Sequence, residues 1–142
     1  MSSPQPDATN LNLQYRTLLI LWVALLMSTV IYVFMTFFLA RPAAAQNPTL
    51  TVALYAMSFL MVVASFVVKS RFVSQSVDLQ DMRLVRVGSV IAWAMCEAAA
   101  LFGLINFFVT QDPYYIVLMA VGFLGILSHM PRRSQLVAAN GG

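Results

Sequence analysis

In the stretch RVGSVIAWAMCEAAALFGLINFFVTQDP, residues 86–113, the apolar run at 87–109 contains one acidic side chain, Glu97, near its middle. A helix needs about 20 predominantly apolar residues to cross the hydrocarbon core of a bilayer. Residues 87–109 meet this length with Glu97 included. The stretch therefore predicts a membrane-spanning helix. It also makes Glu97 the residue that an account of the function has to explain.

The composition of the whole chain is typical of a protein solvated by lipid. Of its 142 residues, 61% are hydrophobic and 9% are charged, whereas soluble domains average about 25% charged residues. Too few charges are present to cover a surface that faces water. We therefore expect an all-α integral membrane protein whose main partner is the lipid bilayer.

Other apolar runs lie on both sides of the opening stretch. Together they predict a membrane domain over residues 16–133 with four transmembrane helices, at about 18–40, 50–68, 87–109 and 114–130. Asn47-Pro48 and Asp112-Pro113 precede the second and fourth spans, each pairing a capping side chain with a proline suited to the first helical turn. Residues 1–15 are expected to form a disordered cytoplasmic tail and residues 134–142 a C-terminal cytoplasmic tail.

The basic residues predict the orientation of these spans. With four spans, only Arg41 falls on one side, and the other seven share the opposite side: Arg16, Lys69, Arg71, Arg83, Arg86, Arg132 and Arg133. Basic residues are enriched on the cytoplasmic side of membrane proteins. We therefore expect a multi-pass protein of the cell (inner) membrane with both termini in the cytoplasm. Topology and lipid headgroups explain the basic clusters, so no nucleic-acid partner is expected.

An internal repeat is also visible. The order Arg16, Trp22, Phe37-Phe38, Asn47-Pro48 recurs as Arg86, Trp93, Phe107-Phe108, Asp112-Pro113, with spacings that shift by a residue or more. One interpretation is two duplicated antiparallel hairpins, as in parallel-repeat membrane folds. The alternative is composition that apolar spans share by necessity.

Glu97 is the strongest candidate for chemistry. A charged carboxylate at the centre of a bilayer costs roughly 2.5–3.5 kcal/mol, and the predicted spans contain no Lys or Arg to neutralise it. The carboxyl is therefore expected to be protonated and hydrogen-bonded to a neighbouring span. The hydroxyl groups that could serve belong to Ser28, Thr29, Tyr32, Tyr55 and Ser58.

Helical geometry separates Glu97 from a stripe of small residues. At 100° per residue, the small side chains lie on the face opposite Glu97, and this predicted helix-packing face comprises Gly88, Ala92, Ala99 and Gly103. Small residues allow membrane helices to approach closely. Glu97 is therefore expected to point away from the tightest packing, toward lipid, a subunit interface or a partner protein.

The segment from Glu97 to Ile105 resembles the carboxylate helix of the proteolipid (c or K) subunits of rotary ATPases. The matching positions are Glu97, Phe102, Gly103, Leu104 and Ile105. The resemblance implies that the Glu97 carboxyl binds a transported proton or sodium ion. The second span lacks the glycines of that family's companion helix, and the family's four-span members carry the carboxylate on the fourth span.

The remaining reactive side chains predict no catalytic or metal site. Cys96 and His129 are the single cysteine and histidine, so the chain cannot build a Cys/His metal cluster or an internal disulfide. We expect Cys96 to be an apolar filler, His129 an interfacial residue, and Gly122 and Gly125 packing notches. The sequence has no nucleophile–base pair and no phosphate-binding loop, so we expect neither an enzyme nor a bound cofactor.

Two functional hypotheses remain. The first is a small polytopic membrane protein that acts as an oligomeric or accessory subunit of a membrane complex. The second is a proton- or ion-translocating component that uses Glu97 and resembles the proteolipids. Intramembrane ionisable residues often mark ion pathways, but a protonated carboxyl can also serve only to hold two helices together.

Overall fold

The computed structural model describes residues 8–39, 47–110 and 112–138, and over these ranges it is helical with short turns. Four longer helices are followed by a short one: α1 (Ala8–Phe38), α2 (Pro48–Leu79), α3 (Met82–Val109), α4 (Tyr115–Ser128) and α5 (Arg133–Ala138). The expected all-α fold is confirmed. In the described part of the chain, α1, α2 and α3 are long and apolar enough to cross a membrane, whereas α4 is apolar but has 14 residues.

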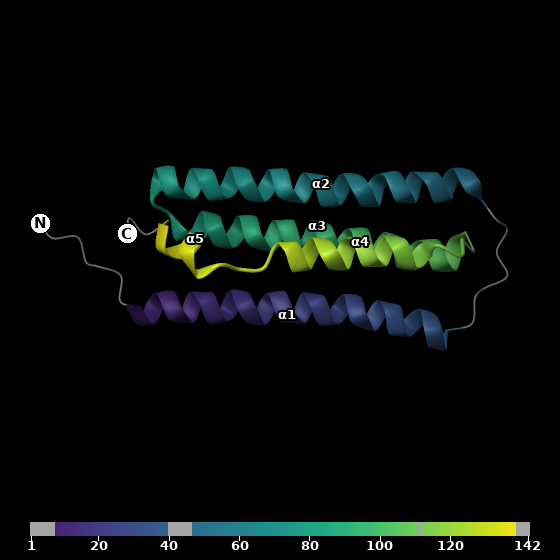
Figure 1. The fold of residues 1–142 in the computed structure, drawn as a ribbon, viewed down its shortest axis with the longest axis horizontal. Coiled ribbons are helices and arrows are strands. Elements are labelled where there is room, and N and C mark those ends of the chain that lie inside the picture. The colour runs from purple at the N-terminus through teal and green to yellow at the C-terminus, as the bar shows by residue number, and fades with distance from the viewer. Residues whose placement is uncertain (1–7, 40–46, 111, 139–142) are drawn as a thin grey trace, which may run out of the picture.

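The helices run side by side along one axis, with α3 and α4 in the middle and α1 and α2 on opposite sides of them (Figure 1). α3 packs against α2, α4 and α1. Of the two expected hairpins, only the pair α3–α4 packs closely as neighbours. α3 and α4 carry glycines where their backbones meet, at Gly103 and Gly122, whereas α1 and α2 contain none.

Local capping explains where α2 begins and ends. Asn47 is its N-cap and accepts a hydrogen bond from the Leu50 amide at 3.1 Å, with Pro48 in the first turn, as predicted. Gln80 adopts a left-handed conformation (φ 49°) and closes the helix. Asp81 then caps α3 by accepting from the Arg83 amide at 2.8 Å. Residues 69–86, which join the predicted spans at 50–68 and 87–109, are therefore mostly helical. Both α2 and α3 extend beyond their apolar runs.

The fourth helix begins later than the sequence suggested. Asp112 does not cap α4; its Oδ1 accepts from the Tyr114 amide at 3.1 Å, and the helix starts at Tyr115. Asp112 instead orders the turn that joins α3 to α4. The described helix therefore covers Tyr115–Ser128 rather than the predicted residues 114–130.

Both tails contain more structure than predicted. α1 begins at Ala8, inside the expected disordered tail, and residues 1–7 lie outside the described residues. α5 forms within the predicted C-terminal tail, and its Leu136 is 1% exposed. Leu136 packs with Leu18 and Trp93, and Arg133 hydrogen-bonds Asn12 of α1. These contacts between distant segments stabilise α5, which is too short to be stable alone.

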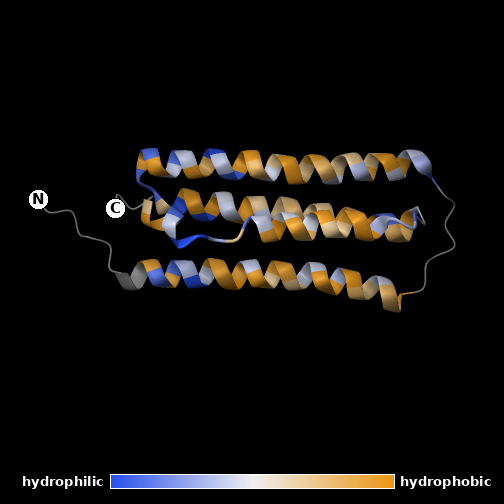
Figure 2. Cartoon of the chain, viewed as in Figure 1, coloured by the Kyte–Doolittle hydropathy of each residue, from blue (hydrophilic) through white to orange (hydrophobic). Residues whose placement is uncertain are grey.

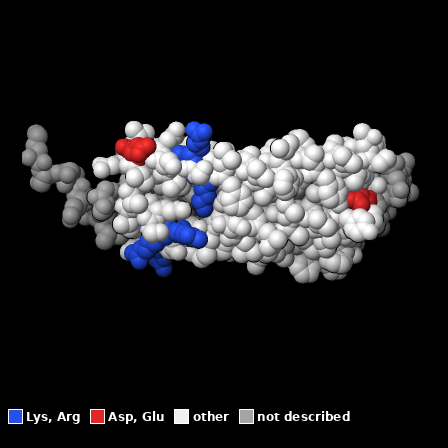
Figure 3. Space-filling view, turned by 45° about the horizontal axis from the view of Figure 1, so that its top comes forward, with Lys and Arg blue, Asp and Glu red and all other residues white. Residues whose placement is uncertain are grey.

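Charge and hydropathy divide the molecule along its length. Apolar residues dominate the helices, and hydrophilic residues gather near the ends (Figure 2). Lys and Arg side chains on the face shown in Figure 3 lie toward the end of the molecule at which both termini are found. This polarity follows from the sequence, because the described basic residues fall at the start of α1, the end of α2, the start of α3 and around α5.

Candidate functional site

Glu97 belongs to α3, and its side chain contacts α1. Its Oε1 accepts hydrogen bonds from the Ser28 hydroxyl at 2.6 Å and from the Tyr32 hydroxyl at 3.0 Å. Ser28 and Tyr32 are four residues apart in α1, a spacing that puts both side chains on one helix face. Both belong to the set of five candidate donors named from the sequence. We call these three residues the carboxyl clamp.

The direction of Glu97 differs in part from the expectation. The small-residue face of α3 contacts α2 and α4. The Glu97 side chain meets α1 of its own chain rather than only lipid or another subunit. The reason is that α1 offers two hydroxyls at mid-helix, and a carboxyl in an apolar environment gains most from such donors. Glu97 is half-buried, so reagents and ions can still approach it.

The Ser28 hydroxyl has two neighbours in the clamp but only one hydrogen. The Ser28 oxygen lies 2.8 Å from the Leu25 carbonyl as well as 2.6 Å from Glu97 Oε1. A serine hydroxyl has one hydrogen to donate but can also accept. Both contacts are satisfied together when Ser28 donates to Leu25 and a protonated Glu97 donates to Ser28. When Glu97 is ionised, Ser28 must turn its hydrogen away from Leu25.

The predicted helix-packing residues are all buried: Gly88, Ala92, Ala99 and Gly103. A Cβ added at Gly88 would lie 2.4 Å from Phe72 Cβ in α2, and one added at Gly103 would lie 2.7 Å from Met119 Cγ in α4. The small-residue face of α3 is therefore in contact with two different helices.

Gly122 of α4 lies directly against the backbone of α3. A Cβ added there would lie 2.6 Å from both the Ala100 amide nitrogen and the Cys96 carbonyl oxygen of α3. At Gly125 the nearest atom is instead the Cys96 Sγ, at 2.7 Å. Cys96 is a free, buried thiol that fills the space between these helices.

A second polar cluster lies at the C-terminal end of α4, and sequence reasoning missed it. His129 is 2% exposed, so its side chain lies inside the bundle. Its Nε2 lies 2.9 Å from the Ser65 hydroxyl of α2, and its ring packs against Phe66 with centroids 4.3 Å apart. Ser65 is 64 positions from His129, so no local pattern could reveal this contact.

The last carbonyl groups of α4 receive donors from three other helices. Trp22 of α1 donates its indole N–H to the Ile126 carbonyl at 2.8 Å. Trp93 of α3 and Lys69 of α2 both donate to the His129 carbonyl, at 2.9 and 3.1 Å. Carbonyls at a helix C-terminus have no partner within the helix. α4 thus ends against side chains that replace the missing turn.

A third cluster stabilises the opposite end. Asp112 Oδ2 accepts from the Tyr55 hydroxyl and from the Asn106 side-chain amide, both at 2.9 Å. Asn106 also contacts the Thr110 hydroxyl. These bonds connect α2, α3 and the turn before α4. The carboxylate is therefore used for structure, and the group resembles no catalytic arrangement.

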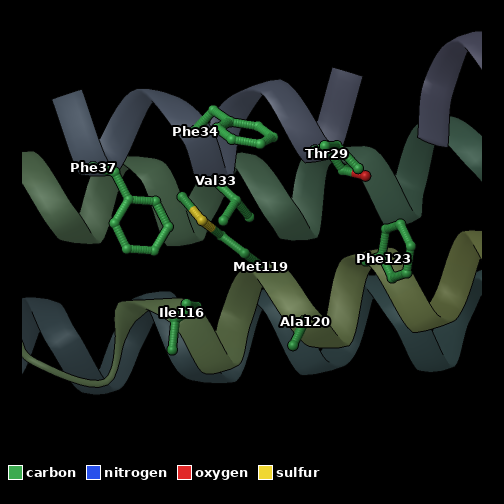
Figure 4. Close-up of a pocket in the computed structure, with 9 residues that line it drawn as sticks. Thr29, Val33, Phe34, Phe37, Ile116, Met119, Ala120 and Phe123 are labelled. Carbon is green, nitrogen blue, oxygen red and sulfur yellow. The ribbon is translucent and has the colours of Figure 1, made fainter. Parts of the chain in front are cut away.

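An apolar groove of about 310 Å³ lies between α1 and α4 (Figure 4). Phe34, Phe37 and Val33 of α1 face Met119 and other apolar side chains of α4 across it. Thr29 contributes the only hydroxyl among the lining residues, and that hydroxyl donates to the Leu26 carbonyl. The groove offers shape to an apolar chain but no polar recognition.

Among the described residues, no group of three or more His, Cys, Asp or Glu side chains could hold a metal ion. The comparisons do not supply a relative: no protein-family model matches the chain, and neither a curated protein nor a solved structure matches it. The candidate functional features of the molecule are therefore the carboxyl clamp, the end of α4 and the exposed helix faces.

Proposed function

We propose that this chain is a four-span membrane protein, with both termini in the cytoplasm, that acts as an oligomeric or accessory subunit of a membrane complex. The unequal burial of the helices supports this proposal. Within an 18-residue apolar stretch of each helix, 44% of the residues are buried in α3, against 11% in α1 and 17% in α2. Two long helices thus keep most of their surface available for lipid or for other subunits.

The end of α4 supports counting it as a fourth span. At 1.5 Å per residue its 14 residues extend about 21 Å, less than the roughly 30 Å hydrocarbon core. A helix that ended within this core would leave costly unpaired carbonyls. The donors from Trp22, Trp93 and Lys69 remove that cost. The short helix, continued by the segment toward α5, can therefore complete the crossing.

The observation that carries the subunit proposal is an exposed stripe along α1. Its members recur at alternating spacings of four and three, the pattern with which helices pack as coiled coils. We call this the α1 stripe: Ile20, Ala24, Met27, Ile31, Phe34 and Phe38. Five of the six are large and apolar, with exposed fractions from 56% at Ile31 to 84% at Phe38. Such a surface fits a helix of another subunit.

Oligomerisation can be tested by native mass spectrometry in mild detergent together with disulfide cross-linking in membranes. In a Cys96→Ala background, we expect Met27→Cys in the stripe to form intermolecular disulfides on mild oxidation. Met57→Cys is the matched control, because Met57 is also an exposed methionine within an apolar helix (46% exposed, against 57% at Met27), but belongs to α2. Met27→Cys should cross-link at least about tenfold faster, since a packed interface raises the effective concentration of the thiols.

Two results would reject the subunit proposal. One is a monomer without co-purifying protein at every detergent concentration tested. The other is equal, slow cross-linking of Met27→Cys and Met57→Cys in a preparation that contains no other protein, which is expected if lipid alone covers both helices. A stable complex with a different protein and no disulfide at Met27→Cys would identify an accessory subunit instead of a homo-oligomer.

The carboxyl clamp favours a second candidate function, in which Glu97 takes up and releases a proton or another cation. Ser28 and Tyr32 both donate to one oxygen when the carboxyl is ionised, and Ser28 can turn to accept when it is protonated. The clamp therefore has a satisfied arrangement for each protonation state. A purely structural contact needs only one arrangement.

This role predicts that dicyclohexylcarbodiimide, which reacts with protonated carboxyls in apolar surroundings, modifies Glu97. Labelling should fall as pH rises, because the reagent attacks the protonated form. Ser28→Ala with Tyr32→Phe should change the labelling curve, since it removes both hydroxyl groups that contact the Glu97 carboxyl. Mass spectrometry of the modified chain measures the effect, and Glu97→Gln serves as the blank.

Asp112 is the matched control carboxyl, because it also accepts a hydrogen bond from a tyrosine hydroxyl but lies in a turn. Its labelling should not respond to the Ser28 and Tyr32 substitutions. Absence of Glu97 labelling at every pH, or a labelling curve that the double substitution leaves unchanged, would contradict a titrating clamp.

A further inference from the structure

A pocket of about 400 Å³ lies at the cytoplasmic end of the proposed topology, between the C-terminal half of α2 and the segment that joins α4 to α5. Lys69 and Ser74 line it from α2, and Arg132 and Gln135 line it from the other side. The pocket differs from the apolar groove in containing two cations together with neutral polar groups.

The two cations are held close without a carboxylate between them. Lys69 is fixed by its hydrogen bond to the His129 carbonyl at 3.1 Å. Arg132 lines the same pocket and is near enough for its charge to act on Lys69, and the residues that line the pocket include no Asp or Glu. Like charges in one pocket lower stability unless an anion joins them. The pocket is therefore electrostatically incomplete by itself.

The surroundings of the pocket indicate what kind of anion fits. Phe66 and Met130 also line it and are 47% and 48% exposed. Cationic groups thus adjoin exposed apolar surface at the point where the apolar part of α2 ends. A lipid with a phosphate headgroup has this combination, because its charge and its acyl chains are covalently joined. A free inorganic anion would leave the apolar side chains uncovered.

We propose that this pocket binds the phosphate of an anionic lipid of the cytoplasmic leaflet, with Lys69 and Arg132 contacting the phosphate oxygens. Arg132 can bind two phosphate oxygens at once, whereas Lys69 acts as a point charge. Gln135 and Ser74 can donate to the remaining oxygens. The acyl chains then lie along Phe66 and Met130. The proposal depends on the membrane topology given above but not on the oligomeric state or on proton uptake.

Such a lipid would strengthen the end of the bundle. The segment after α4 is attached to α2 through the bonds of Lys69 and Ser65 to His129. A phosphate shared by Lys69 and Arg132 would add a bridge between the same two segments. A ligand that binds only the folded state stabilises it by mass action. Anionic lipid should therefore raise the thermal stability of the folded chain.

The test uses the full-length chain, stripped of lipid and titrated in detergent with phosphatidylglycerol or phosphatidylcholine of identical acyl chains at 0.15 M salt. Native mass spectrometry measures the bound lipid. Wild type should prefer phosphatidylglycerol, and Arg132→Gln should weaken that binding about fivefold, the effect expected for one charge near a membrane surface. Lys69→Gln with Arg132→Gln should abolish the preference. Arg132→Gln alone keeps the Lys69 bond to His129, so its fold is expected to survive.

Arg71→Gln with Arg83→Gln is the matched control, because it removes the same number of charges near the same end but outside the pocket. This control should keep its lipid preference within about twofold at a salt concentration that screens distant charges. Equal losses in pocket and control variants, or no preference in wild type, would overturn the site. Competition by millimolar inorganic phosphate would show that a free anion, rather than a lipid, is the ligand. Variants that still float with liposomes remain bound to the membrane, so failure of the site is distinguishable from failure of membrane insertion.

Discussion

Trp93→Ala is expected to lower the free energy of unfolding by about 3 kcal/mol, the largest loss that we predict for a single truncation. Trp93 is fully buried. It packs with Leu18 of α1, Leu136 of α5 and Val85 of its own helix. Replacement of a buried aromatic by alanine costs about 3–5 kcal/mol in water-soluble cores. In the proposed membrane setting the lower end applies, because lipid would solvate the apolar surface of separated helices and leave packing as the main loss.

The indole N–H of Trp93 adds a second contribution that can be separated. Trp93→Phe keeps most of the ring volume but loses the bond to the His129 carbonyl. We expect it to cost about 1 kcal/mol, the net value of one hydrogen bond, because Lys69 still donates to the same carbonyl. Unfolding in mixed micelles with increasing SDS, followed by circular dichroism, measures both variants. Equal costs for Trp93→Ala and Trp93→Phe would contradict the packing role.

Gly122→Ala is expected to cost about 2–3 kcal/mol, the upper part of the range for overpacking. The new methyl group would collide with the backbone of α3, at the Ala100 nitrogen and the Cys96 oxygen. Backbone atoms inside a helix cannot move without displacing the whole helix, so α3 and α4 must separate. The same SDS titration reports the loss of stability.

Gly125→Ala is the matched control on the same helix. Its new methyl group meets the Cys96 sulfur, the end of a side chain that can rotate. The cost should therefore be smaller, and Cys96→Ala should recover part of it. Cys96→Ala should not rescue Gly122→Ala, because the obstructing atoms there belong to the backbone. A rescue of both variants would show that sulfur, not backbone contact, limits the approach of the two helices.

Much of the fold could be predicted because its signals are local. The Asn47-Pro48 start depends on neighbouring residues, and the small-residue face of α3 follows from helical periodicity alone. The hydroxyl partners of Glu97 could be narrowed to five, since few donors occur inside apolar spans. The choice of Ser28 and Tyr32 required knowing that α1 packs against α3 at this level.

The parts that the sequence did not predict depend on contacts between distant segments. Burial of His129 requires Ser65 on α2, and α5 is ordered by contacts of Leu136 with α1 and α3. The early start of α1 and the continuation of α2 to Leu79 have a different cause. Hydropathy marks only the apolar part of a span, and a polar helix can extend beyond it.

The hydrogen bonds at the end of α4 impose an order on biosynthesis. Their acceptors are the carbonyls of Ile126 and His129. Their donors, Trp22, Lys69 and Trp93, belong to helices that are synthesised earlier. In the proposed topology, α4 can therefore settle in the bilayer only against helices that the ribosome has already delivered. A chain that stopped before α4 would leave the indole N–H groups of Trp22 and Trp93 without these acceptors.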